Sequence, residues 1–248
     1  AHALQHGLYE RSVDDHLLLL EHPHVFTLGR RGELDHLLVD PASVGAELVR
    51  SDRGGDITYH GPGQLVGYPL LHLPDKGAGG AERSGAIAPM ADTVAYVRSV
   101  EQLVIDVLAD VGLPGADRLP DYPGVWIGVG SDDPRKIAAI GVRLTRGRTM
   151  HGFALNVAPD LDYFGHIVPC GIPDKGVTSL AAEGVDVVLV SRTGEDLVST
   201  GIVELQYLGQ TVPGLKFEKY GAYVQPSIRG ISTLVTQASS EANIALYI

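Results

Sequence analysis

Short apolar runs, interrupted by proline and glycine, dominate the beginning of the chain. His16–Glu21 contains four consecutive leucines, and residues 22–29 hold a turn followed by an apolar stretch. Two more runs follow, Ile57–Tyr59 between glycine-rich turns and the aromatic-bearing Leu65–Leu73. Apolar runs of this length between Pro and Gly are typical of β-strands. The pattern therefore predicts a strand, a turn and a strand in the first two runs, and then two further strands.

The clearest helical signal begins near Asp92. Asp92 or Thr93 can cap a helix, and Gly112 and Pro114 end the pattern. Apolar residues between these limits recur at separations of three or four, at Val97, Val100, Leu103, Val104, Val107, Leu108 and Val111. This spacing predicts one helix with a single apolar face. Just before it, residues 74–89 are rich in Gly and Ala, which predicts a surface loop.

Three more runs with the composition of strands follow the helix, at Val125–Val129, Ile137–Leu144 and Thr149–Val157. One long helix among many strands indicates an α+β fold with a largely antiparallel sheet. The character of the chain changes after about residue 181, although 202–212 and 230–237 have strand-like composition. We therefore predict a domain in residues 1–182 and a C-terminal segment, 183–248, without an assigned role.

Composition and charge exclude several classes of function. Of the 248 residues 44% are apolar, which supports a sizeable core and excludes wholesale disorder. The net charge of −11 argues against a general binder of nucleic acid or of anionic membranes. No apolar run approaches the ~18–20 residues that span a bilayer. A signal-peptide pattern is not visible, so the cytosol is the expected compartment.

Two segments place polar side chains in settings that can bind a ligand, one in a glycine-rich loop and one at the start of an apolar strand. Four glycines in residues 53–64 allow a ligand to approach the backbone closely, and Arg53 and His60 supply polar groups there. Two tight turns in an ordinary meander would have the same pattern. Lys136 opens an apolar strand, where burial disfavours the ammonium form. A solvated strand end is the commoner environment for a lysine.

Cys170 is the only cysteine, which excludes an internal disulfide and a zinc site built from several cysteines. Pro169 and Gly171 place it in a turn. A free cysteine is more often a small buried apolar residue than a nucleophile. His60 and His151 are rival bases for this thiol, and each could equally be a hydrogen-bonded core histidine.

Taken together, these segments identify a family far more specifically than any one of them does alone. RGGDITYHGPGQLVGYP at 53–69, RKIAAIG at 135–141, HGFALNV at 151–157, and PCGI followed by GVTSL at 169–180 resemble the lipoyl(octanoyl) transferases of lipoate biosynthesis. The motifs occur in that family's order and at similar spacing. EHP at 21–23 and TLGRR at 27–31 match as well. The resemblance covers roughly residues 3–182, and the chain begins inside what resembles the family's first helix.

The resemblance implies a fold like the catalytic domain of biotin and lipoate protein ligases, an α+β fold with a mixed, mainly antiparallel sheet and packed helices. It implies a cytoplasmic enzyme that uses no cofactor and no metal. In this family an octanoyl group moves from octanoyl-acyl carrier protein to a lysine of a lipoyl domain, through a cysteine thioester. The implied acceptors are the lipoyl domains of 2-oxoacid dehydrogenase E2 subunits and the glycine cleavage H protein.

Carried over by motif, the resemblance makes Cys170 the acyl-thioester nucleophile and Lys136 the group that activates it. It also implies that three short stretches line the acyl pocket. Their residues are Arg53, Gly54, Gly55, Asp56, Ile57, Thr58, Tyr59, His60, Ala139, Ile140, Gly141, Gly152, Phe153 and Ala154.

Electrostatics is consistent with one lysine activating one thiol. A free cysteine with a pKa of about 8.5 is only a few per cent thiolate at neutral pH. Lowering such a pKa by ~2 units requires about 2.7 kcal/mol of preference for the anion. An ammonium ~4 Å away supplies roughly 4 kcal/mol at an effective dielectric near 20. No histidine is needed for this step.

A docking surface follows from the implied partner. Acyl carrier proteins are usually acidic, so an acidic enzyme needs a local basic patch for encounter. The candidates are Arg30, Arg31, Arg143, Arg146 and Arg148. A charged hairpin tip is the simpler interpretation of the last three.

Other functions fit parts of the pattern. An ATP-dependent lipoate ligase of the same fold would form an adenylate and need no cysteine. A catalytically inactive module would only hold an acyl group or a lipoyl domain. HGPGQ at 60–64 and the presence of both Lys136 and Cys170 favour the transferase. An RNA binder that uses the arginines is disfavoured by the net charge.

Overall fold

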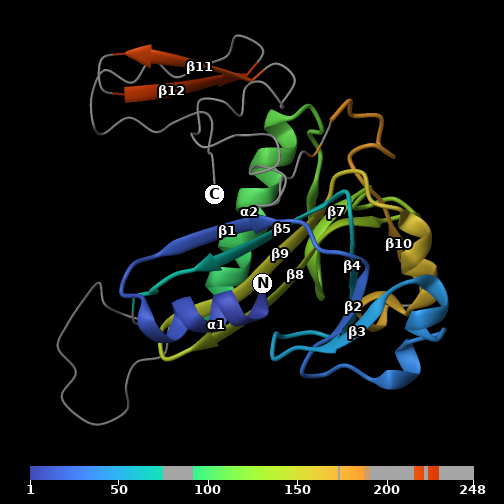
Figure 1. The fold of residues 1–248 in the computed structure, drawn as a ribbon. Helices are drawn as coiled ribbons and strands as arrows, with labels where there is room; N and C mark the ends of the chain where they lie inside the picture. Colours follow the sequence, from blue (N-terminus) through green and yellow to red (C-terminus); the bar gives the residue numbers. More distant parts are fainter. Residues whose placement is uncertain (75–91, 173, 188, 190–214, 221–222, 229–248) are drawn as a thin grey trace. The chain divides into compact units, whose positions relative to one another are not determined.

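The computed structural model describes residues 1–74, 92–172, 174–187, 189, 215–220 and 223–228 (Figure 1). The chain divides into two compact units, Ala1–Leu189 and Val190–Ile248. The boundary after residue 182 stays a prediction. The loop expected within 74–89 and the strand-like segments 202–212 and 230–237 lie outside the described residues, except for Pro74.

The main sheet belongs to the first unit and has seven strands in the described part of the chain. In spatial order, six of them are β1 (His16–Leu20), β5 (Gln64–Leu70), β9 (Arg148–Asn156), β8 (Arg135–Thr145), β7 (Tyr122–Ile127) and β6 (Asp117–Leu119). These neighbours are antiparallel, whereas the short β10 (Gly176–Val177) runs parallel to β8. The predicted α+β fold with a mixed, mainly antiparallel sheet is confirmed.

A second sheet, three-stranded among the described residues, has β2 (Val25–Leu28) as its central strand. β3 (Glu47–Arg50) is parallel to it, and β4 (Ile57–His60) is antiparallel. The predicted strand–turn–strand of residues 16–29 is therefore correct, but its two strands belong to different sheets. β3 escaped prediction because all of its residues are exposed, so it lacks an apolar run.

The helix α2 (Thr93–Asp110) packs on the sheet, and Asp92 caps it by accepting bonds from the backbone N–H groups of Val94 and Ala95, at 3.0 and 3.1 Å. Its buried apolar side chains are Tyr96, Val100, Val104 and Leu108. The predicted apolar face was too wide, because Leu103, Val107 and Val111 are 39–48% exposed. Contact with a single sheet buries only a narrow stripe of a helix.

The remaining described elements are short or terminal. The helix α1 (His2–Arg11) lies along β5 and β9, and four 3₁₀ turns join the strands, at η1 (Leu34–His36), η2 (Pro41–Val44), η3 (Leu161–His166) and η4 (Pro169–Gly171). The second unit contains one antiparallel hairpin among its described residues, β11 (Leu215–Tyr220) with β12 (Tyr223–Ile228). Neither described α-helix has both the length and the apolar composition to cross a bilayer.

Candidate active site

A cavity of about 1070 Å³ opens in the first unit between β4, β8, β9 and the start of α2. This is slightly more than the ~300–1,000 Å³ that small-molecule sites usually occupy. Both Lys136 and Cys170 line it. So do all the residues expected in the acyl pocket except Ile57 and Tyr59.

Ile57 and Tyr59 lie on the other side of β4. Both side chains are fully buried and pack in a small core with Phe26 and Phe164. Successive side chains of a strand point to opposite faces, so Thr58 and His60 reach the cavity instead. The structure therefore does not place Ile57 and Tyr59 on the cavity wall.

Cys170 occupies the turn η4 in a backbone conformation unusual for a non-glycine residue. Its φ is +57°, which costs of order 1–3 kcal/mol. Bonds from the backbone N–H of Gly171 to the carbonyl of Val168 and from that of Ile172 to the carbonyl of Pro169 hold the turn, each at 3.0 Å. The thiol is half-buried. A residue held in a strained turn at a cavity wall is a frequent feature of functional sites.

Lys136 enters the same region from β8. Its side chain is buried, and its Nζ lies 4.7 Å from the centroid of the Trp126 ring. Gly124 leaves room for it, because a Cβ there would lie 3.3 Å from Cε of Lys136. Lys136 and Cys170 together line a small recess that adjoins the cavity. The two residues that the motifs single out from separate elements are thus brought to one place.

Hydrogen-bonded side chains form one wall of this recess. Gln64 donates through Nε2 to Oδ1 of Asn156 at 2.8 Å, and its Oε1 lies 2.7 Å from Nδ1 of His60. Asn156 in turn donates to the carbonyl of Thr178 at 2.9 Å. A fully bonded buried network of this kind rigidifies a site. Gln64 and Asn156 were not among the predicted site residues, although both stand inside the motifs that carried the resemblance.

The two histidines considered as bases for the thiol have other partners. Burial lowers the pKa of His60 to about 3, so its ring is neutral near pH 7. Burial also lowers the pKa of His151, partly offset by Asp52, whose Oδ1 lies 2.6 Å from Nε2 of His151. Both correspond to hydrogen-bonded core histidines, and the low pKa makes His60 a weak base.

A buried arginine, Arg53, interacts with Cys170 by charge. Its buried guanidinium donates to the carbonyl of Thr27 at 2.5 Å and to the carbonyl of Gly54 at 3.0 Å. Burial lowers the pKa of Arg53, and favourable charge interactions, with Cys170 first, partly offset this effect. Gly141 makes room for this side chain, because a Cβ there would lie 3.1 Å from Cδ of Arg53.

A histidine–aspartate pair supports the turn on its other side. Nδ1 of His36 lies 2.5 Å from Oδ2 of Asp56, and a Cβ at Gly171 would lie 2.8 Å from the same oxygen. Only a glycine after Cys170 leaves space for this close approach. The carbonyl of His36 accepts a 2.8 Å bond from the N–H of Val168, which ties η1 to the entrance of η4. His36 belongs to none of the motifs, so no signal in the sequence points to it.

We expect the buried His60 to make the fold sensitive to acid. Its pKa is about 3 in the fold and near 6.5 when unfolded, so the unfolded chain binds the extra proton between these values. Stability therefore rises with pH in this window. The free energy of unfolding should fall by about 2 kcal/mol from pH 7 to pH 5 through this group. Urea unfolding at the two pH values measures the change.

The matched variants separate His60 from general acid effects. Between pH 7 and pH 5 the free energy of unfolding should fall less for His60→Gln than for the parent. For His72→Gln, which alters an exposed histidine, it should fall as much as for the parent. An equal fall in the His60→Gln variant would contradict the assignment.

Comparisons with known proteins agree on one family. A family model described as the lipoyl protein ligase A/B catalytic domain matches residues 1–197. An octanoyltransferase of Solibacter usitatus is 53% identical over 174 residues, which cover 69% of this chain and 70% of the relative. An octanoyltransferase of Salinispora arenicola is 50% identical over 184 residues, which cover 72% of this chain and 78% of the relative.

The fold also matches solved structures. A bi-partite lipoate protein ligase from Thermoplasma acidophilum superposes with a TM-score of 0.56, covering 75% of this chain and 71% of that one. A lipoate-protein ligase A bound with ATP gives a TM-score of 0.52 over 75% of this chain and 72% of that one. The sequence identities are only 19% and 21%, so these two matches support the fold and no further property.

Proposed function

This chain belongs to the lipoyl protein ligase A/B catalytic domain family, and we propose that it is an octanoyltransferase of lipoate biosynthesis that works through a thioester on Cys170. The donor is octanoyl-acyl carrier protein, and the acceptor is a lysine of a lipoyl domain. The observation that supports this mechanism is that Lys136 and Cys170, from separate elements, line one recess of the cavity.

The first half-reaction moves the acyl group to the enzyme. The Cys170 thiolate attacks the carbonyl carbon of the carrier thioester, a new C–S bond forms, and the bond to the carrier sulfur breaks. The carrier leaves as a thiolate and takes a proton from the Lys136 ammonium, which leaves this lysine neutral for the second half-reaction. Arg53 interacts with Cys170 by charge, and Lys136 lines the same recess as Cys170, so we expect both cations to assist the anionic nucleophile. One thioester replaces another, so the step is nearly isoenergetic and needs no ATP.

The second half-reaction passes the group to the acceptor. The lysine amine of the lipoyl domain attacks the Cys170 thioester, a C–N bond forms, and the cysteine thiolate leaves. The amine must lose a proton, which Lys136 in its neutral form can accept. The amide is more stable than the thioester, so the transfer is downhill.

Small side chains shape the wall along which the octanoyl chain lies. Ala139 pairs with Ala154, and Gly141 pairs with Gly152, across β8 and β9. Each buried methylene contributes about 0.8 kcal/mol to binding. The two glycines also serve packing, because a Cβ at Gly152 would clash with the carbonyl oxygen of Gly67.

The proposal extends to partners and compartment. We expect E2 lipoyl domains of 2-oxoacid dehydrogenases and the glycine cleavage H protein as acceptors. We also propose a cytoplasmic location, because a free thiol nucleophile has to stay reduced.

A transfer assay separates this function from an ATP-dependent ligase. The full chain is incubated with a lipoyl domain and either octanoyl-acyl carrier protein without ATP, or free octanoate with ATP. We expect octanoylated lipoyl domain only in the first mixture, by mass spectrometry. Product only in the second mixture would establish the ligase, and no product in either would indicate a binding module.

We take Arg31 as the position at which to test the expected docking patch for the carrier. Arg143 donates to the Asp52 carboxylate and Arg148 to the carbonyl of Tyr9, so both support the fold. Arg31 is exposed and lines the cavity. Arg31→Glu should raise the KM for the acidic carrier several-fold and flatten its dependence on salt.

The control for this prediction is Arg11→Glu, an equal charge change at the exposed end of α1. Steady-state kinetics at two ionic strengths should give the same KM for Arg11→Glu as for the parent. If Arg31→Glu and Arg11→Glu behave alike, the carrier docks elsewhere.

A further inference from the structure

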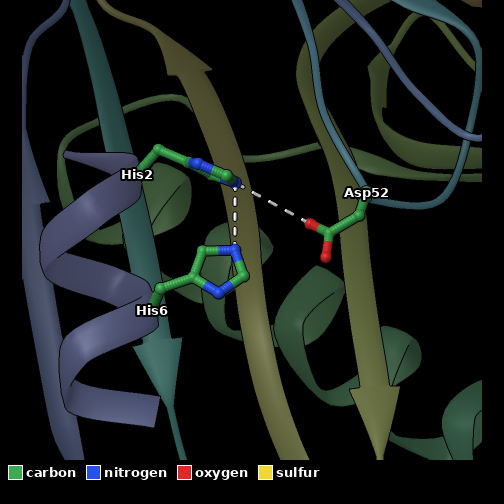
Figure 2. A group of neighbouring side chains, drawn as sticks. All are labelled: His2, His6 and Asp52. Carbon is green, nitrogen blue, oxygen red and sulfur yellow. Dashed lines mark hydrogen bonds and ion pairs between the residues drawn. The ribbon is translucent and has the colours of Figure 1, made fainter. Parts of the chain in front are cut away.

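A cluster of two histidines and one aspartate lies between α1 and the segment that leads into Arg53, outside the cavity lining. Figure 2 shows His2 and His6 pointing from α1 toward Asp52. Nε2 of His6 lies 3.2 Å from Nε2 of His2, which lies 4.0 Å from Oδ1 of Asp52. We propose that this cluster binds a divalent transition-metal ion and that Zn²⁺ suits it best.

The spacing of the ligand atoms matches a tetrahedral ion. Zinc bonds to nitrogen and oxygen of ~2.0–2.2 Å place two tetrahedral ligands about 3.4 Å apart. The two imidazole nitrogens already have nearly this separation, and the three ligand atoms lie within 4.8 Å of one another. A small rotation of Asp52 or His2 closes the remaining gap. Water would complete the coordination.

The docking of α1 fixes the two histidines in place. His2 and His6 are four residues apart, so they share one face of the helix. The adjoining face carries Gln5 and Tyr9. Gln5 is buried and its Oε1 accepts a 3.0 Å bond from the backbone N–H of His151, while Tyr9 donates to the carbonyl of Thr145 at 3.1 Å. These bonds hold α1 on β8 and β9 with the histidine face toward Asp52.

Asp52 is oriented in the same way as carboxylate ligands of known metal sites, by hydrogen bonds from its surroundings. Nε2 of His151 lies 2.6 Å from its Oδ1, and Arg143 donates to its Oδ2. The charge of Arg143 offsets that of Asp52. The cluster therefore offers imidazole nitrogen rather than strong negative charge.

This ligand set indicates which ions can bind. Imidazole suits Zn²⁺, Cu²⁺ and Ni²⁺, whereas Ca²⁺ takes six to eight oxygen ligands and Mg²⁺ prefers octahedral oxygen. A single carboxylate beside an arginine is a poor site for either of the latter. The metal would tie α1 to the residue that precedes Arg53, and so reinforce one side of the cavity. This role is separate from octanoyl transfer and does not depend on it.

The test uses the full chain without an affinity tag, in the Cys170→Ser background, so that the thiol cannot bind metal. Calorimetric titration with Zn²⁺ should give one saturable site per chain. His2→Ala and His6→Ala should each weaken binding at least tenfold, and Zn²⁺ should raise the melting temperature of the parent but not of the His6→Ala variant. Both changes introduce a good helix former, at an exposed position for His2 and at a partly exposed one for His6, so the fold is retained.

The control is His72→Ala, which removes a histidine that also faces a carboxylate, at 3.0 Å from Asp15, but belongs to no cluster of three possible ligands among the described residues. Its affinity for Zn²⁺ should equal that of the parent. The proposal is overturned if the parent shows no saturable binding, or if both α1 variants bind as tightly as the parent. Equal binding of Mg²⁺ or Ca²⁺ would overturn the assignment to transition metals.

Discussion

Incubation with octanoyl-acyl carrier protein should add a single octanoyl group to the intact chain, at Cys170. Because Cys170 is the only cysteine, any thioester-linked group must sit there. Hydroxylamine should remove it. The acylated chain, once separated from the carrier, should pass the group to a lipoyl domain, since a covalent intermediate lets one protein leave before the other arrives. Intact-protein mass spectrometry follows each step.

Cys170→Ser should show no turnover, although its far-UV circular dichroism spectrum should match that of the parent. A serine hydroxyl is far less acidic than a thiol, and an ester would be a sluggish donor to the amine. Cys170→Ala is the matched control for loss of the side-chain heteroatom. Substantial transfer by either variant would refute the covalent mechanism and favour direct transfer between the two bound partners.

Lys136→Ala should lower kcat/KM by about a hundredfold or more, because it removes both the charge that favours the thiolate and the base for the second half-reaction. The rate of iodoacetamide alkylation of Cys170 at neutral pH should fall with it. Lys136→Met should behave in the same way while it keeps the packing of the side-chain stem against Trp126. That variant separates the loss of charge from the loss of volume.

The control is Lys175→Ala, which removes a nearby lysine whose Nζ contacts Asp174 at 2.5 Å. Its alkylation rate should match that of the parent. If alkylation is unchanged in Lys136→Ala but falls in His151→Gln or His60→Gln, a histidine governs the thiol instead.

Sequence motifs pointed to residues that line the cavity where the fold places those motifs side by side in one sheet. The motifs that contain Ala139–Gly141 and Gly152–Ala154 lie on β8 and β9, which pair directly. It was harder to predict which residues of a strand face the cavity. All four residues of β4 are buried, so its pattern has no polar side that would separate Thr58 from Tyr59.

Features built by long-range contact could not be predicted. His36 and Asp56 are twenty residues apart and meet only because η1 folds back toward β4. The apolar residues Leu103 and Val107 fit the helical period but face outward, since periodicity does not reveal how much of a helix a sheet covers. The positive φ of Cys170 likewise depends on the whole turn.

The space that Gly141 leaves for Arg53 also constrains how such an enzyme can change. A bulkier residue at 141 would shorten the cavity but displace the guanidinium beside Cys170, and one at Gly152 would strike the backbone of β5. Ala139 and Ala154 form a cross-strand pair on the same wall. Selection for a different acyl length, in nature or in the laboratory, is therefore expected to act first at these two alanines.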